Sequence, residues 1–129
     1  MFSASFAVLA LAAVLVSPAV ASRWECGERS NLPPEGKNYC AASDFRQSEI
    51  NLSKVLKSLM EYHKIEYGDA SALSNAQNAF EVYRDNHCTA ENRRIEDKPY
   101  HPMLVAQCKT RLTNIRINEL KLMQQKSRY

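Results

Sequence analysis

Apolar residues recur at three- and four-residue steps through the middle of the chain, which is the period of an amphipathic helix. The first stripe predicts a helix that begins at Ser43 or Asp44, either of which can act as its N-cap, and ends near Tyr67. Gly68 follows at the position where helices commonly stop. The apolar face carries Leu52, Val55, Leu56, Leu59, Met60 and His63, and the opposite face carries Lys54, Lys57, Ser58 and Glu61.

Two further stripes predict two more helices. The second helix begins at Asp69 or Ser71 and runs to roughly Arg93, and the third begins at Pro102 or Met103, where proline is well tolerated. The expected faces are Leu73, Ala76, Gln77, Phe80, Arg84 and Cys88 in the second helix, and Leu104, Cys108, Leu112, Ile115 and Leu122 in the third. With no strand pattern or repeat, the sequence predicts an all-α, three-helix domain with the last two helices antiparallel.

The N-terminus has the pattern of a secretory signal. Residues 6–16 are apolar, too few to span a bilayer, and Ala19-Val20-Ala21 offers small residues for cleavage. We therefore expect a signal peptide at 1–21, with a retained anchor as the alternative. An irregular, disulfide-closed segment at 22–42 is expected next, because two prolines interrupt it, followed by the helical domain at 43–129.

Four cysteines in an exported chain predict two disulfides. Of the three possible connectivities, Cys26–Cys40 with Cys88–Cys108 is preferred, because both rings are short and local. A domain of this size has a modest core, and closing a loop of about 15 residues adds about 3 kcal/mol on the chain-entropy model.

The net charge of +3 is unevenly distributed. From Lys109 onward there are six basic residues and one acidic residue, which is a local excess of +5. Such a helix is either a solvated face or a contact for an anionic surface. Nucleic acid is not an expected partner, because the chain is exported and aromatic residues are not interleaved with these charges.

The segment Leu73–Cys88, LSNAQNAFEVYRDNHC, resembles the core motif of the lysozyme-inhibitor LprI-like family, L-x-x-A-Q-x-x-W-x-x-[YF]-R-D-x-x-C. A second similarity is the later cysteine, Cys108, followed at helical spacing by Thr113, Arg116 and Leu120. The resemblance extends from Cys40 to Leu120. Departures are Phe80 for the usual Trp, Glu49, Ser53 and Leu56 for Asp, Asn and Tyr in the first helix, and Pro99–Pro102 for a Gly-rich step.

The resemblance implies a helical, disulfide-linked, periplasmic or secreted domain, and by analogy lysozyme inhibition. The motif residues are expected to be structural. Arg84 on an apolar stripe needs a partner, either Glu49 or a group near Thr113, because an unpaired buried charge is costly. Gln77 and Asp85 are expected to serve the same network, and Phe80, Thr113 and Arg116 are the other expected structural residues of the motif.

A stiff loop between the last two helices is the candidate target-binding site. It carries Arg93, Arg94, Lys98, Tyr100 and His101. A preorganised cationic loop suits a glycan cleft that contains two carboxylates. No nucleophile motif appears, and the three histidines lack metal-ligand spacing, so no enzyme activity, cofactor or metal is expected.

The sequence therefore favours a non-enzymatic binding protein of the cell envelope that inhibits a muramidase. The alternative is an envelope structural or adaptor module whose basic C-terminal helix contacts anionic lipid or another protein, with membrane contact that is at most peripheral.

Overall fold

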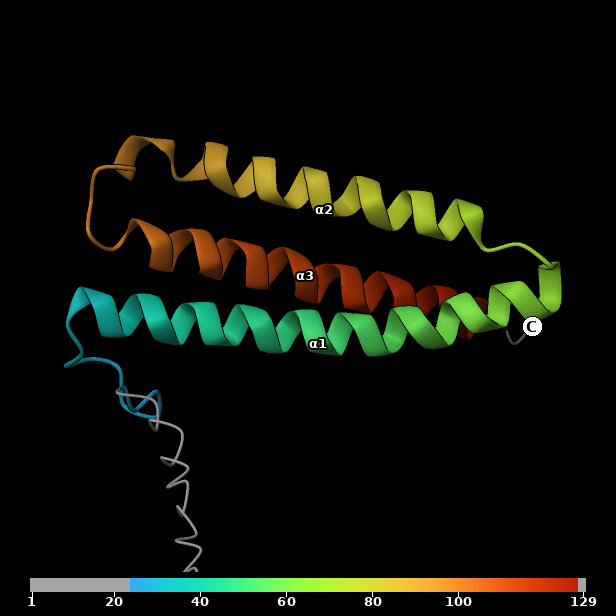
Figure 1. The fold of residues 1–129 in the computed structure, drawn as a ribbon, viewed down its shortest axis with the longest axis horizontal. Coiled ribbons are helices and arrows are strands. Elements are labelled where there is room, and N and C mark those ends of the chain that lie inside the picture. Colours follow the sequence, from blue (N-terminus) through green and yellow to red (C-terminus); the bar gives the residue numbers. More distant parts are fainter. Residues whose placement is uncertain (1–23, 128–129) are drawn as a thin grey trace, which may run out of the picture.

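Three long helices make up most of residues 24–127, the part of the chain that this computed structural model describes. They are α1 (Pro34–Tyr67), α2 (Ser71–Glu91) and α3 (His101–Lys126), and the short 3-10 helix η1 (Arg93–Ile95) follows α2. The three helices lie lengthwise beside one another (Figure 1). The described residues contain no strand, so the predicted all-α, three-helix fold is confirmed. The leader expected at 1–21 lies outside the described residues.

Both predicted disulfides are present. Cys26 is bonded to Cys40 and Cys88 to Cys108, with Cα–Cα distances of 5.5 and 5.6 Å. The first bond attaches the N-terminal segment to the start of α1. The second links the C-terminal end of α2 to the beginning of α3, and it therefore closes the connection between these two antiparallel helices.

The expected start of the first helix at Ser43 or Asp44 is wrong, because α1 already begins at Pro34. Proline is tolerated at the first helical position, where its missing N–H would have had no partner in the helix. Trp24 packs over Gly36, so closely that an added Cβ would lie 2.8 Å from its ring. Thus only residues 24–33 of the described part of the expected irregular segment are non-helical. The predicted stop at Gly68 is confirmed, with a φ of 70°.

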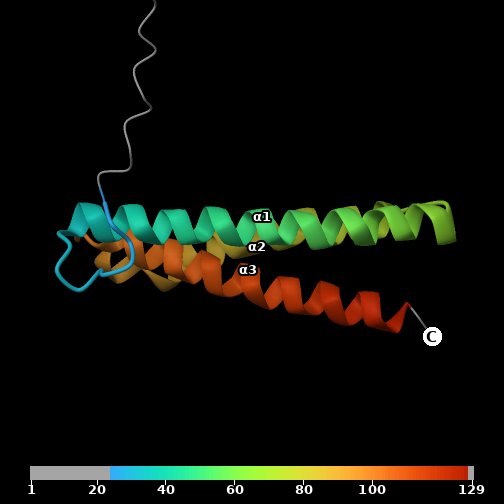
Figure 2. The same ribbon diagram turned by 90° about the horizontal axis from the view of Figure 1, so that it is seen from below.

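α1 and α3 run parallel and keep a constant register along their length. Near the start, the amide N–H of Met103 donates to Oδ1 of Asn38, and near the end the hydroxyl of Tyr62 donates to the carbonyl of Ser127. Both pairs are 65 residues apart in the sequence. α3 packs chiefly against α1, while α2 lies behind this pair in the view of Figure 2.

The core is divided into two clusters. The larger joins all three helices through Leu52, Leu59, Leu73, Ile117 and Leu120, and the smaller surrounds the second disulfide with Cys88, Cys108 and Leu112. The expected apolar face of the first helix is confirmed, since Val55, Leu56 and Met60 pack against the larger cluster. No helix within the described residues is long and apolar enough to cross a membrane.

The predicted buried face of the third helix is partly wrong. Ile115 and Leu122 are 48% and 57% exposed, whereas Thr113 and Leu120 are fully buried. Because α3 packs chiefly against α1, its buried strip is turned toward that helix. Ile115 lines an open groove of about 450 Å³ between α2 and α3, to which α2 contributes Ala76, Ala79, Phe80 and Tyr83.

Candidate functional site

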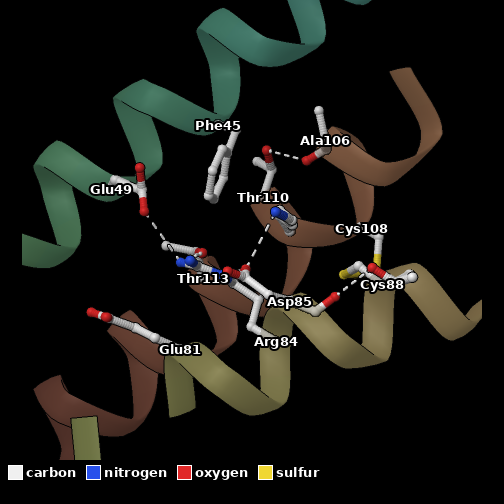
Figure 3. Close-up of polar contacts among 12 residues, drawn as sticks. Phe45, Glu49, Glu81, Arg84, Asp85, Cys88, Ala106, Cys108, Thr110 and Thr113 are labelled. Atoms are coloured by element: carbon white, nitrogen blue, oxygen red, sulfur yellow. Dashed lines mark hydrogen bonds and ion pairs between the residues drawn. A yellow bond between two sulfur atoms is a disulfide. The ribbon is translucent and has the colours of Figure 1, made fainter. Parts of the chain in front are cut away.

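Arg84 lies inside the bundle, where α2 faces both other helices (Figure 3). Its side chain is only 6% exposed. The guanidinium donates to the carboxylate of Glu49 on α1 and to the hydroxyl of Thr113 on α3, both at 3.4 Å. Its Nε donates to Asp85 at 2.9 Å. Arg84 thus makes both interhelix contacts that its place on an apolar stripe suggested, and it links all three helices.

Two aromatic rings flank this guanidinium. The ring of Phe45, which points from α1 toward Arg84 in Figure 3, lies 4.9 Å from its Cζ, and the ring of Phe80 lies 5.7 Å away. Lys109 also lies over Phe45, at 5.6 Å. Each cation–π contact of this kind is worth about 0.5 to 2 kcal/mol, depending on how far the charge is removed from water. Phe80, in the position of the family's Trp, provides one of these aromatic contacts.

Asp85 forms ion pairs with basic side chains from two helices. It pairs with Arg84 at 2.9 Å and with Lys109 on α3 at 3.4 Å. Partial burial acts to raise the pKa of Asp85, but the hydrogen bond from Arg84 and the charges of Arg84 and Lys109 outweigh it, so the pKa is lowered. A lowered pKa means that folding favours the ionised carboxylate.

Replacing Asp85 by Asn should therefore make the free energy of unfolding fall less steeply as the pH is lowered in the acid range. The ionised carboxylate stabilises the fold above the ordinary aspartate pKa of about 3.9, and this contribution is lost as the pH falls through the lowered pKa. At neutral pH the loss should stay below about 1 kcal/mol, since the carboxylate is half exposed. Urea midpoints measured between about pH 2 and pH 7 test this. Asp97→Asn, whose ion pair is with the adjacent Lys98, is the control; equal slopes in both variants would contradict the prediction.

A second polar contact joins α2 to α3. The buried Gln77 accepts a hydrogen bond from Nε of Arg116 at 3.2 Å, and Nη1 of Arg116 pairs with Glu119 at 3.1 Å. Arg116 also lies 5.7 Å from the ring of Phe80, so that ring lies near two guanidinium groups. The structure thus brings the expected motif residues together as a polar layer between helices.

The expected target-binding loop lies elsewhere, at the end of the bundle where α2 connects to α3. Arg93 faces Glu96 at 3.7 Å and Lys98 faces Asp97 at 3.2 Å; the side chain of Lys98 is half exposed and the other three are largely exposed. Arg94 is exposed, and no ion pair is found for it within residues 24–127. Tyr100 is 40% exposed, and His101, half-buried, is the first residue of α3.

Asn38 attaches this loop to α1. Its Nδ2 donates to the carbonyl of Pro99 at 2.9 Å, and its Oδ1 accepts from the amide of Met103 at 3.0 Å. One side chain therefore satisfies backbone groups on both sides of His101. Sequence reasoning missed Asn38, because no local signal connects it to a segment more than 60 residues away.

One cluster of potential metal ligands was also missed. His87, Glu91 and Cys108 bring ring nitrogen, carboxylate oxygen and sulfur within 4.8 Å of one another. Comparing the histidines only with each other could not find this cluster. The His-x-x-x-Glu spacing, which puts both side chains on one face of α2, was the available signal.

These features define a small helical domain linked by disulfides and by a buried arginine. A sequence model of the family described as "Lysozyme inhibitor LprI" matches residues 29–120. The chain belongs to this family, as its motif predicted. It is also similar to a protein of Rhizobium meliloti (strain 1021) described as uncharacterized, with 31% identity over 124 residues, covering 88% of this chain and 89% of the relative. No solved structure matches the chain.

Proposed function

We propose that this protein is an exported, non-enzymatic binding protein of the cell envelope that inhibits a muramidase. Membership of a family described as lysozyme inhibitors carries the proposal. The two disulfides support export to the periplasm or beyond, because such bonds persist in oxidising compartments and are rare in the cytosol.

We assign target binding to the braced loop of residues 93–101. The Cys88–Cys108 bond links the two helices that the loop connects, and Asn38 fixes the backbone at Pro99 and Met103. Backbone hydrogen bonds inside it, from Lys98 to Ile95 and from His101 to Lys98, tighten it further. A loop that is already ordered loses little entropy on binding, so more of its contact energy appears as affinity.

The chemistry of the loop suits a muramidase cleft. Glycoside hydrolases place two carboxyl groups on either side of the scissile bond. Arg94 presents a guanidinium with no ion pair among the described residues, while Arg93 and Lys98 have only exposed acidic neighbours that a target carboxylate can replace. A guanidinium can bind a carboxylate through two parallel hydrogen bonds. The net charge of +3 gives no overall steering toward a basic lysozyme, so the electrostatic attraction comes from these local cations and the target's carboxylates.

Four carboxyl groups have a pKa shifted in the direction opposite to that of a glycosidase general acid. A hydrogen bond from Ser30 lowers the pKa of Glu28, one from Arg29 lowers that of Asp44, and one from the amide of Ser71 lowers that of Asp69. The pKa of Asp85 is also lowered. A general acid for glycoside hydrolysis needs a raised pKa.

The alternative of an adaptor that uses its basic C-terminal helix is less well supported. Three of the basic residues of α3 are paired within the chain: Lys109 with Asp85, Arg111 with Glu91, and Arg116 with Glu119. Lys121 and Lys126 remain exposed on α3, and Arg128 lies outside the described residues. α3 therefore presents less free positive charge than its sequence suggests.

The test is inhibition of lysozyme by the oxidised mature protein in a turbidity assay. Replacing Arg93, Arg94 and Lys98 together by Ala should raise the concentration for half-inhibition at least about tenfold, equivalent to 1.4 kcal/mol of binding. The melting temperature should stay nearly unchanged, because surface substitutions away from structural features change stability by about 0.5 kcal/mol or less.

The matched control removes the same charge elsewhere, with Lys54, Lys57 and Lys121 all replaced by Ala. These three side chains are exposed and lie outside the loop, so inhibition should persist. Equal loss in both triple variants would show that net charge, not the loop, carries binding. If the folded wild-type protein inhibits none of the lysozymes tested, with each structural class of lysozyme represented, the proposed function is wrong.

A further inference from the structure

We propose that the reduced form of this protein binds a zinc-type metal ion between α2 and α3, at a site made by Cys88, Cys108, His87 and Glu91. The proposal does not depend on lysozyme inhibition. It concerns the place now held by the second disulfide, where the sulfur of Cys108 lies within 4.8 Å of a ring nitrogen of His87 and a carboxylate oxygen of Glu91, and Cys88 is bonded to that sulfur.

The ligand set fits zinc. Thiolate, imidazole and carboxylate are the side chains that zinc prefers, and four of them complete a tetrahedral structural site. Zinc–ligand bonds of about 2.0 to 2.3 Å place the donor atoms within about 4 Å of one another. The atoms of His87, Glu91 and Cys108 already lie within 4.8 Å, and Cys88 is bonded to Cys108. After reduction the two sulfurs, no longer bonded, must move apart to nearly 4 Å, and Cys88 then supplies the fourth ligand.

The surroundings of the cluster support an ion of this charge. Two thiolates and one carboxylate carry three negative charges, which a divalent ion leaves at one. Arg111 supplies a compensating charge, because its Nη2 lies 3.6 Å from the sulfur of Cys108 and 2.9 Å from an oxygen of Glu91. Groups that hold metal ligands in place from outside the coordination sphere are a regular part of metal sites.

An entry path is also present. Cys108, Glu91 and Arg111 line an open hollow of about 300 Å³, together with Asn92, Leu104 and Gln107. The ring of Tyr83 lies 5.4 Å from that of His87, which limits the orientations of the imidazole. The buried disulfide therefore has one side from which a small reductant or an ion can approach.

The exchange of one cross-link for the other balances as follows. A water-soluble phosphine cleaves the sulfur–sulfur bond, takes an oxygen atom from water to become the phosphine oxide, and leaves two thiols. Zinc then displaces the two thiol protons and binds both thiolates, the neutral imidazole and the carboxylate. The ion would join α2 to α3 where the disulfide joins them in the oxidised protein.

Cobalt is the probe for this site, because a tetrahedral Co²⁺ site with thiolate ligands absorbs strongly in the visible and near ultraviolet. The protein is reduced with phosphine and titrated with Co²⁺. The affinity for zinc is then measured from the loss of the cobalt absorbance as added Zn²⁺ displaces Co²⁺. We expect one ion per chain with a thiolate-to-cobalt band. His87→Ala and Glu91→Gln should each weaken binding at least about tenfold, whereas the controls His101→Ala and Glu96→Gln should not.

Two double variants separate the cysteine pairs. The Cys26→Ser/Cys40→Ser protein should retain the cobalt spectrum, and the Cys88→Ser/Cys108→Ser protein should lose it. Should reduction unfold the chain, zinc must restore its helical circular dichroism, since binding at a structural site is coupled to folding. Three results would overturn the proposal. They are absence of the thiolate-to-cobalt band, cobalt affinity unchanged in the His87 and Glu91 variants, or zinc binding to an unfolded reduced chain without recovery of its helical circular dichroism.

Discussion

Replacing Arg84 by Ala is expected to lower the free energy of unfolding by about 2 to 3 kcal/mol, through lost hydrogen bonds and cation–π contacts. The guanidinium is the only group in the described residues that contacts Glu49, Asp85 and Thr113 together. Its loss leaves the fully buried hydroxyl of Thr113 without this partner. The melting temperature should fall by roughly 10 to 15 °C for a domain of this size, and urea unfolding followed by circular dichroism measures the change.

The matched control is Arg46→Ala, because Arg46 is an exposed arginine of α1 outside this network. Its effect should stay within about 0.5 kcal/mol. Arg84→Met separates charge from volume, since apolar residues sometimes replace buried ion pairs without loss. We expect Met to recover only part of the stability, because it cannot donate to Thr113. A stability of Arg84→Ala equal to that of the wild type would disprove the structural role of this arginine.

The position of Arg84 could be predicted because two local rules conflict there. Helical periodicity places a guanidinium on an apolar face, and burial of an unpaired charge is costly. The conflict is resolved by partners at the same level of the other two helices, and Glu49 and Thr113 were the available choices. Likewise, the apolar stripe from Leu52 to Met60 was strong enough to define the packed face of α1 without knowledge of its neighbours.

Helix boundaries and the face of α3 could not be predicted in this way. Proline disrupts a helix interior but suits its first turn, so Pro33 and Pro34 are compatible with either a turn or a helix start. Packing of Trp24 on Gly36 accompanies the helical outcome. Similarly, Ile115 satisfies helical spacing, yet it borders an open groove between α2 and α3, and its exposure depends on how these two helices pack.

Contacts between distant parts of the chain account for the rest of what was missed. Asn38 braces the loop only because α1 and α3 lie parallel in a fixed register, which follows from the whole fold. The cluster of His87, Glu91 and Cys108 likewise needs the α2–α3 contact. The sequence thus identified which residues need partners, and the packing of the helices determined which partners they have.

Replacing Cys88 and Cys108 together by Ser is expected to cost about 3 kcal/mol of unfolding free energy. The bond spans 20 residues and includes the loop of residues 93–101. Without it, the C-terminal end of α2 and the loop should open locally more often than the rest of the bundle. Amide hydrogen exchange there should accelerate up to about a hundredfold, because each 1.4 kcal/mol corresponds to a factor of ten.

The Cys26→Ser/Cys40→Ser variant tests whether this effect is local. Its bond spans 14 residues, so the chain-entropy model gives a similar but slightly smaller global loss. The faster exchange should now fall in residues 24–40 and spare the end of α2. If exchange in residues 93–101 is unchanged in the Cys88→Ser/Cys108→Ser protein, Asn38 is sufficient to hold the loop. The contact with α1 would then be what keeps the loop ordered, and inhibition through the proposed site should persist without the disulfide.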